Sequence, residues 1–331
     1  MKKLFALLMA AMMLLCCVAC GGGNDTPNPP TDTTASITIG TGSTSGTYYA
    51  YTNAVGMILK DATGYTYNVI STGGSVANIN GIEDGDYNMA IVQNDTMIKA
   101  YNKLDDFNFP VAITSFSVLG EVYSEVMQVV VRSDLKDTVK TLADVKGLRV
   151  SIGDAGSGTE ANAKALLAAY GVSTDDITVQ NLSVNNSADA MKDGKLDVFF
   201  FTSGAPTTAI TDLSTTKTAY LVSLDDEHID SLLSTSPYYT KHIIPAGTYN
   251  GQDEDVTTVA VGAVILARDD VSEDAIYAFT ADIFDNAADL VSSHAKYGEL
   301  STEFGASITS VPYHPGAAKY FAEKGFDVAT K

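Results

Sequence analysis

Five loops rich in glycine, serine and threonine are the parts of this sequence best suited to bind a small ligand. Each follows a β-rich segment and precedes a helical one, and they cover residues 40–49, 71–75, 93–95, 153–160 and 202–206. In open parallel sheets, ligands bind beyond the carboxyl ends of the strands, where the N-termini of helices also point. We therefore expect three loops from one half of the fold and two from the other to face a single cleft.

The candidate ligand-binding residues in these loops are small or carry a hydroxyl, amide or carboxyl group. They are Thr41, Gly42, Ser43, Thr47, Tyr48, Gly74, Ser75, Gln93, Asp95, Gly156, Ser157, Gly158, Thr159, Ser203 and Gly204. We expect one of Tyr48 and Tyr49 to face the cleft and the other to pack in the core, because an aromatic ring with a polar tip suits an amphipathic ligand. Asp95 either binds an ammonium group or caps its own helix, and Ser75 and Thr159 can also serve as helix caps.

Arginine, which clamps carboxylates with two hydrogen bonds, is scarce in this chain. The three arginines are Arg132, Arg149 and Arg268, and each flanks or ends a β-rich segment. Arg132 lies where a hinge is expected and is the one cation that we keep as a candidate ligand contact. Its alternative role is that of a surface residue at the end of a strand.

Motifs for phosphate binding and catalysis are incomplete. Gly40 and Gly42 begin a dinucleotide-like pattern whose sixth position is Ser45, and Thr159 stands where a P-loop requires lysine. The four histidines share no i,i+4 spacing, and Ser157 does not lie in the pattern of a nucleophile elbow. We expect no catalytic residue, cofactor or metal. An exported α/β hydrolase remains the alternative, because a catalytic triad is recognised by geometry rather than by sequence order.

The elements that must position these loops alternate between strands and helices. Strands are expected at 36–40, 65–71, 87–92, 118–123, 126–132, 150–152, 177–181, 196–201, 219–223 and 255–268. Helices are expected at 47–60, 75–83, 94–102, 159–170, 188–192, 205–213, 272–287, 288–294 and 316–323. Such an alternation is typical of βαβ units and a mostly parallel sheet.

This pattern predicts an α/β protein with two lobes. The first lobe comprises residues 36–130 and 258–331, and the second comprises residues 131–257. The two β-rich segments 118–132 and 255–268 would each cross from one lobe to the other and together form a hinge. Hinge closure around a ligand is a common motion for this layout.

The N-terminal segment has the pattern of a bacterial export signal. Lys2 and Lys3 precede an apolar run over residues 4–18, and Cys20 follows directly after Ala19. We expect a signal peptide over 1–19, lipidation of Cys20 and a flexible tether over 20–35, which would place the protein in the periplasm or on the outer face of the cell membrane. The alternative is ordinary cleavage without a lipid. No cysteine follows Cys20, so the folded part relies on its core and not on disulfides.

The formal net charge of −20 limits the class of partner. Phosphate backbones are bound by clustered lysine and arginine, so we expect no nucleic-acid partner. Direct contact with anionic lipid is disfavoured for the same reason. A large negative net charge is typical of an exported protein whose molecules repel one another and so remain in solution.

An ordered series of short segments resembles the TAXI branch of the TRAP transporter receptors. The segments are IGTG (39–42), GTYY (46–49), STGGSVAN (71–78), AIVQND (90–95), QVVVR (128–132), GSGT (156–159), DA (189–190), DGKLD (193–197), TSGAP (202–206), IPAGTY (244–249), QDEDV (252–256) and HPGA (314–317). The sequence departs from the family pattern at Ala50 and Asn94, which both lie near the expected ligand pocket, and Cys17 departs from the usual lipoprotein cleavage pattern, which has leucine there.

The resemblance implies a periplasmic-binding-protein-like fold of type II and a role without catalysis. It also implies a TRAP membrane permease as partner, driven by an ion gradient, and a small carboxylate or amino acid, such as glutamate or glutamine, as ligand. We expect a monomer. A receptor of the same fold that passes the ligand signal to a membrane sensor kinase is an alternative that the residues leave open.

Overall fold

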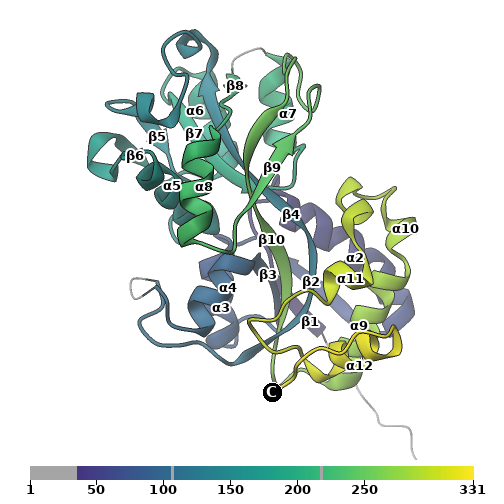
Figure 1. The fold of residues 1–331 in the computed structure, drawn as a ribbon. Coiled ribbons are helices and arrows are strands. Elements are labelled where there is room, and N and C mark those ends of the chain that lie inside the picture. Colours follow the sequence, from purple (N-terminus) through teal and green to yellow (C-terminus); the bar gives the residue numbers. More distant parts are fainter. Residues whose placement is uncertain (1–35, 106–107, 217–218) are drawn as a thin grey trace, which may run out of the picture. The chain divides into compact units, whose positions relative to one another are not determined.

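The computed structural model describes residues 36–105, 108–216 and 219–331, apart from the side chains of 57–63 (Figure 1). The predicted signal peptide, the tether and the lipidation site Cys20 lie outside the described residues. None of the described helices is both long and apolar enough to cross a membrane.

Ten strands in the described part of the chain form one mixed sheet in the order β2-β1-β3-β10-β4-β7-β5-β6, with β8 beside β4 and β9 beside β10. Their bounds are β1 Ser36–Gly40, β2 Thr66–Ile70, β3 Met89–Gln93, β4 Phe116–Arg132, β5 Arg149–Ser151, β6 Thr178–Gln180, β7 Val198–Ser203, β8 Ala219–Leu221, β9 Thr240–Ile244 and β10 Val256–Arg268. The predicted α/β class is confirmed: β1 pairs in parallel with β2 and β3, and β5 pairs in parallel with β6 and β7.

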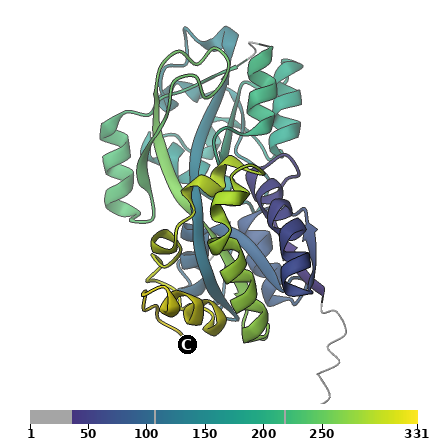
Figure 2. The same cartoon turned by 90° about the vertical axis from the view of Figure 1, so that its right-hand side faces the viewer.

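The two long strands β4 and β10 run side by side through the structure (Figure 2). They pair antiparallel from Phe116 with Arg268 to Val126 with Ala260. Beyond that point they separate, because β4 continues beside β7 and β8 whereas the start of β10 pairs with β9. The prediction of two strands over 118–123 and 126–132 was wrong, since Ser124 and Glu125 interrupt the apolar pattern but remain in one strand.

The helices cover both faces of the sheet. Their bounds are α2 Thr47–Thr63, α3 Ser75–Glu83, α4 Asn94–Tyr101, α5 Gly158–Ala169, α6 Val184–Lys192, α7 Thr208–Thr215, α8 Asp226–Thr235, α9 Glu273–Asp285, α10 Ala287–Leu290, α11 Thr302–Gly305 and α12 Pro315–Glu323, with 3₁₀ turns η1 Ser133–Leu135, η2 Leu142–Val145, η3 Thr174–Asp176 and η4 Ala295–Glu299. Figure 1 shows α3 and α4 on one side of β1, β3 and β10, and α2, α9 and α12 on the other. Helix α8 and strand β9 were missed by the prediction.

Local sequence explains where the helices begin. Ser157 accepts a hydrogen bond from Glu160 N at the start of α5, and Ser272 does the same for Ala275 N at the start of α9. Such caps satisfy backbone amides that have no partner inside the helix. Acidic residues in the first turn, such as Glu273, also favour these starts through the helix dipole.

The hydrophobic core is divided along the sheet. One cluster contains buried residues from 37–123 and 263–321, and we call the elements around it the first region. Two further clusters contain buried residues between 127 and 261, and we call the elements around them the second region. In the second region, residues of α5 and α8 belong to one cluster and residues of α6 and α7 to the other, as expected for helices on opposite faces of β7.

Candidate ligand-binding site

A small cavity lies where the loops of the first region meet those of the second. Its volume is about 50 Å³. Its lining is Gly42, Ser43, Gly46, Thr47, Tyr48, Gly73, Gly74, Ser75, Gln93, Glu125, Gly153, Asp154, Ser157, Gly158, Thr159, Leu182, Val184, Phe201, Thr202 and Ser203. The loops after β1, β2, β3, β5 and β7 all contribute, so the carboxyl ends of both parallel strand groups face the same space.

Eleven of the predicted contact residues line this cavity. They are Gly42, Ser43, Thr47, Tyr48, Gly74, Ser75, Gln93, Ser157, Gly158, Thr159 and Ser203. Of Tyr48 and Tyr49, one of which was expected to face the cleft, Tyr48 is the one that lines the cavity. Tyr49 is only half-buried, and the neighbouring core position is filled by Tyr51. The expectation that Tyr49 packs in the core was therefore wrong.

Three predicted residues lie just outside the lining and hold the loops. The Thr41 hydroxyl donates to Ile70 O at 2.7 Å and joins the loops after β1 and β2. Gly156 N donates to the Glu160 carboxylate at 2.7 Å, which fixes the start of α5. Gly204 O accepts a hydrogen bond of 3.3 Å from the Thr47 hydroxyl.

Asp95 is buried but does not line the cavity. Its carboxylate forms an ion pair of 2.8 Å with Lys99, four residues later in α4. Asp95 was predicted either to bind an ammonium group or to cap its helix. The ammonium group that it binds in the structure is that of Lys99, in the same chain. The side chain does not cap α4 either, because the residue lies in the first turn of the helix.

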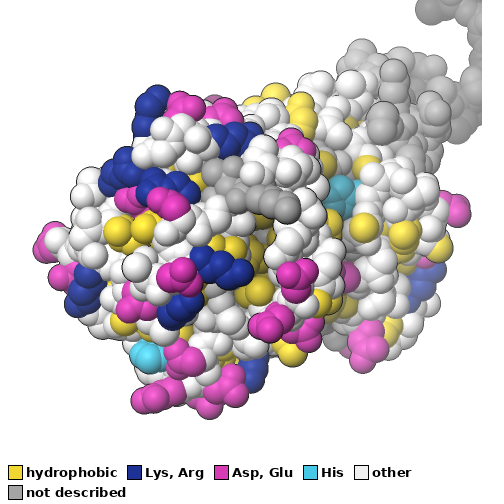
Figure 3. Space-filling model, turned by 90° about the horizontal axis from the view of Figure 1, so that it is seen from above, with side chains coloured by type: hydrophobic (Ala, Val, Ile, Leu, Met, Phe, Trp, Pro, Cys, Tyr) yellow, Lys and Arg dark blue, Asp and Glu magenta, His cyan; other side chains and the backbone are white. Residues whose placement is uncertain are grey.

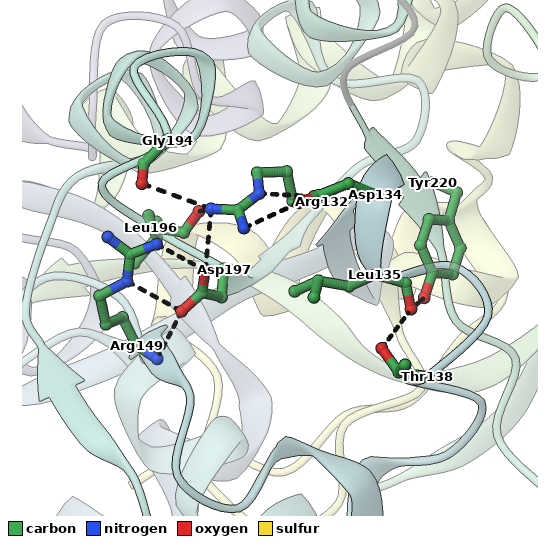
Figure 4. Close-up of polar contacts among 9 residues, drawn as sticks. All are labelled: Arg132, Asp134, Leu135, Thr138, Arg149, Gly194, Leu196, Asp197 and Tyr220. Carbon is green, nitrogen blue, oxygen red and sulfur yellow. Dashed lines mark hydrogen bonds and ion pairs between the residues drawn. The ribbon is translucent and has the colours of Figure 1, made fainter.

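Arg132 ends β4 and does not line the cavity. Figure 4 shows its side chain beside those of Asp134 and Asp197. Its guanidinium contacts the Asp134 carboxylate at 2.6 and 3.1 Å and Asp197 at 2.9 Å. Arg149 contacts Asp197 at 2.6 and 2.9 Å. Asp197 directly precedes β7 and Arg149 begins β5, so this cluster joins the starts of strands whose opposite ends form the cavity.

Glu125, in β4, is a charged residue of the lining that the sequence analysis missed. It is 2% exposed, and the Tyr48 hydroxyl donates to its Oε2 at 2.5 Å. Gln93 also hydrogen-bonds it. The signal in the sequence was a charged residue inside an otherwise apolar run, which was interpreted as a gap between two strands.

Burial shifts the protonation of the carboxyl groups in this site. The pKa of Glu125 is raised to about 8, mainly by desolvation and in addition by the nearby charge of Asp95, whereas Tyr48, Lys296 and Gln93 oppose the rise. Desolvation also raises the pKa of Asp154 above its ordinary value. The pKa of Tyr48 rises well above its ordinary value, mainly through burial and then through the charge of Glu125.

Helix N-termini direct partial positive charge into the cavity. Helix α2 begins at Thr47, α3 at Ser75 and α5 at Gly158, and these three residues all belong to the lining. Backbone amides and the helix dipole at such positions favour anions. The hydroxyls are partly engaged already, because Ser75 Oγ accepts from Gln93 N at 3.0 Å and Thr159 Oγ1 accepts from Thr202 N at 3.2 Å.

The two regions touch directly around the cavity. Ser203 Oγ donates to Thr47 Oγ1 at 2.9 Å and accepts from Thr47 N at 3.3 Å. Ser45 Oγ donates to Asn185 Oδ1 at 2.5 Å. These contacts leave little free volume between the loops of the two regions.

A second cavity of about 410 Å³ lies within the second region, between β8, α7 and the loop that leads into β10. Val130, Ile210 and Leu221 form part of its wall, and Asp253 and Glu254 contribute carboxylates. Figure 3 looks onto this end of the structure and shows acidic and basic side chains interspersed with hydrophobic ones. The loops at the carboxyl ends of the parallel strands do not reach this cavity.

The sequence of residues 39–325 matches the NMT1-like family. A solved structure from Bordetella bronchiseptica RB50 is similar, with a TM-score of 0.55 and 14% identity, over 87% of this chain and 89% of that one. The binding protein component of an ABC phosphonate transporter from Pseudomonas aeruginosa has a TM-score of 0.50 and 14% identity, over 80% and 79% of the two chains. An alkanesulfonate-binding protein from Xanthomonas axonopodis pv. citri, bound to MOPS, has a TM-score of 0.49 and 14% identity, over 87% and 83%. The fold is that of solute-binding proteins of transport systems.

Proposed function

The chain belongs to the NMT1-like family, and from that membership and the geometry of the cleft we propose that it is an exported solute-binding protein of a transport system. The observation that carries this proposal is the cavity at which the loops of both regions meet. In this account a small solute enters between the regions, and the closed form is the one that the transport partner recognises. The affinity of the ligand for the closed form, relative to the open one, drives closure.

The two regions act as lobes in this proposal. The first lobe is residues 36–130 with 258–331, and the second is residues 131–257. The division of the hydrophobic core and the separation of β4 from β10 beyond Val126 and Ala260 support a two-lobe layout, although the core cluster changes between Tyr123 and Met127 and between Val261 and Ala263, a few residues from these bounds. Hinge motion would then be absorbed by β4 and β10, the two long strands that run through both regions.

The ligand class that we propose is a small carboxylate or an amino acid of the glutamate or glutamine type. Three helix N-termini reach the cavity at Thr47, Ser75 and Gly158, which suits a carboxylate without an arginine clamp. The resemblance to TAXI receptors points to the same class. The contacts would be made by the lining residues and not by Thr41, Asp95, Arg132, Gly156 or Gly204.

The partner that the resemblance implies is a TRAP membrane permease driven by an ion gradient. We propose that the protein is exported, anchored by a lipid on Cys20, and monomeric.

A hydrolase would need an activated nucleophile beside a base. The Ser157 hydroxyl instead accepts the capping hydrogen bond of α5, and His228, His294 and His314 accept hydrogen bonds or pair with carboxylates outside the cavity lining.

The proposal is tested by thermal melting of the purified protein against amino acids, dicarboxylates, sulfonates and phosphonates. A ligand at about 100 times its Kd adds about 2.7 kcal/mol to the free energy of unfolding. We expect a clear rise in Tm with glutamate, glutamine or a related acid, and no turnover of ester substrates by the same sample. Labelling of a serine by a fluorophosphonate probe, together with ester turnover, would favour the hydrolase instead.

A further inference from the structure

The charged side chains of the cavity lining are both carboxyl groups. Among the lining residues, which all belong to the described part of the chain, Glu125 and Asp154 are acidic and none is lysine, arginine or histidine. Glu125 lies at the hinge, between the loops of the two regions. A ligand that carried only negative charge would bring that charge close to this carboxyl group.

The groups that surround Glu125 come from several elements and leave its charge unpaired. Tyr48 of α2 and Gln93 of β3 form hydrogen bonds with it, and Tyr123 of β4 interacts with it electrostatically. The remaining charged neighbours are Asp95 of α4 and Lys296 of η4.

Both of these charged neighbours already have partners. Asp95 pairs with Lys99 at 2.8 Å, and Lys296 pairs with Glu299 at 2.5 Å. No ion pair to Glu125 occurs within residues 36–105, 108–216 and 219–331. The site therefore offers a buried carboxyl group that hydrogen-bond donors hold in place and that lacks a cation of its own.

We propose that Glu125 binds an ammonium group of the ligand, while the N-termini of α3 and α5 bind its carboxylate. This inference rests on the proposed solute-binding function and assigns the recognition of the amine to one residue. Helix α3 starts at Ser75 and α5 at Gly158, so the anionic end would lie between the two regions. The amine would lie against β4, and its pairing with Glu125 would couple ligand binding to the hinge.

Proton release follows from this arrangement. Because burial raises the pKa of Glu125 to about 8, this carboxyl group is protonated in most of the protein molecules at neutral pH. An ammonium group pairs with the carboxylate form, so binding transfers the carboxyl proton to the buffer. The association constant should then rise about tenfold per pH unit well below pH 8 and level off above it.

The opposite arrangement predicts the opposite sign. A protonated Glu125 could instead donate its O–H to an anionic group of the ligand. Binding would then require the proton, and affinity would fall as the pH rises through 8. A glutamine at position 125 could replace that donor, whereas it cannot supply the negative charge that an ammonium needs.

The test is isothermal titration calorimetry of the full protein with L-glutamate, L-glutamine and the amine-free acid glutarate, between pH 6.0 and 8.5. We expect the amino acids to bind more tightly than glutarate and the affinity of L-glutamine to rise about tenfold from pH 6 to pH 7. Glu125→Gln should lose at least about tenfold in affinity and show a flat pH profile. Titrations in two buffers of different ionisation enthalpy should show that the wild type releases a proton on binding and that Glu125→Gln does not.

Two further variants separate this role from a structural one. Tyr48→Phe removes a hydrogen bond that lowers the pKa of Glu125, so the midpoint of the pH profile should move upward. Glu121→Gln is the matched control, because Glu121 is also buried in β4, hydrogen-bonds Ser307 and does not line the cavity. It should leave the affinity and the pH profile unchanged.

The outcomes distinguish the two levels of the proposal. Tighter binding of glutarate than of the amino acids, falling affinity with rising pH, or unchanged affinity in Glu125→Gln would overturn the role of Glu125 while leaving the binding function intact. Failure of all three probes to bind the wild type would overturn the role of Glu125 together with the proposed glutamate-type ligand class, and failure of the whole melting panel would overturn the binding function.

Discussion

The side-chain amide of Asn162 donates a hydrogen bond to Gln93 Oε1 over 2.9 Å, and both residues are buried. Gln93 ends β3 in the first region, and Asn162 lies in α5 of the second. Tyr239 donates to Asn162 Oδ1 at 2.8 Å, and Gln93 also bonds Glu125. A continuous buried network therefore joins the cavity carboxyl to both regions. Buried polar networks of this kind are costly to break, because their members lose partners without gaining water.

Gly158→Ala should prevent the regions from closing. A Cβ at this position would overlap the side-chain amide of Gln93, which would have to move and lose its hydrogen bonds to Glu125 and, across the boundary between the regions, to Asn162. We expect at least about a tenfold loss of ligand affinity, equivalent to about 1.4 kcal/mol, measured by calorimetry. Gly298→Ala is the control, because a Cβ there would meet no atom of the described residues within 4 Å. Equal affinities for the two variants would contradict closure at this contact.

Ser203→Ala should weaken ligand binding more than folding. Its hydroxyl both donates to Thr47 Oγ1 and accepts from Thr47 N across the boundary between the regions. Loss of such hydrogen bonds costs about 1 kcal/mol, so we expect roughly a fivefold drop in affinity. Ser214→Ala is the matched variant, because Ser214 hydrogen-bonds Thr211 and Asn250 within the second region. An affinity loss in Ser214→Ala as large as that in Ser203→Ala would argue against the assignment.

Asp197→Asn should destabilise the fold and leave ligand binding unchanged. Two arginines, Arg149 and Arg132, contact this carboxylate, and removing its charge should lower the free energy of unfolding by about 1.5–3 kcal/mol at pH 7. The hydrogen bonds from Arg149 hold the pKa of Asp197 below its ordinary value. Its stabilising effect is therefore fully present above about pH 4, the pKa region of an unfolded aspartate, and is lost as the pH falls through the lower folded value.

Urea denaturation of the wild type and Asp197→Asn over pH 2.5–7 measures this effect. The difference in unfolding free energy should be largest above pH 4 and should shrink toward acid pH. A difference that grows toward acid pH, or a loss of ligand affinity in the variant, would show that the cluster in Figure 4 has a different role.

Tyr123→Phe should be tolerated. The Tyr123 hydroxyl is buried and has no hydrogen-bond partner among the described residues. Removing it should change the free energy of unfolding by less than about 0.5 kcal/mol or raise it, since an unsatisfied buried hydroxyl is itself unfavourable. Tyr297→Phe is the comparison, because that hydroxyl donates to Tyr51 O at 2.7 Å, and its loss should cost about 1 kcal/mol. Chemical denaturation that ranks the two variants in the reverse order would contradict this expectation.

The sequence predicted the parts of the site that depend on local pattern. The loops follow strands and begin helices, so the spacing of Gly40, Ser75 and Ser157 was enough to place their loops at one edge of the sheet. Residues whose role depends on a distant partner were harder to place. Arg132 looked available as a ligand contact because nothing in its neighbourhood of the chain indicates that Asp197 lies beside it.

The division of residues 118–132 into two strands was the largest error in the predicted fold near the site. Ser124 and Glu125 broke the apolar period, and a break in the period normally marks the end of a strand. In the structure the same two residues remain in β4, where Glu125 turns into the cavity and is satisfied by Tyr48 and Gln93. Only the fold supplies those partners, since they belong to α2 and β3.

The central claim is that a small solute binds between the two regions, in the cavity lined by the five loops. Hydrogen–deuterium exchange of the full protein, with and without saturating L-glutamate, tests it most directly. The account predicts slower exchange of backbone amides in both regions, at residues 42–48 and 73–76 and also at 157–160 and 202–204. Protection confined to one region, or centred on residues 249–256 around the second cavity, would contradict it.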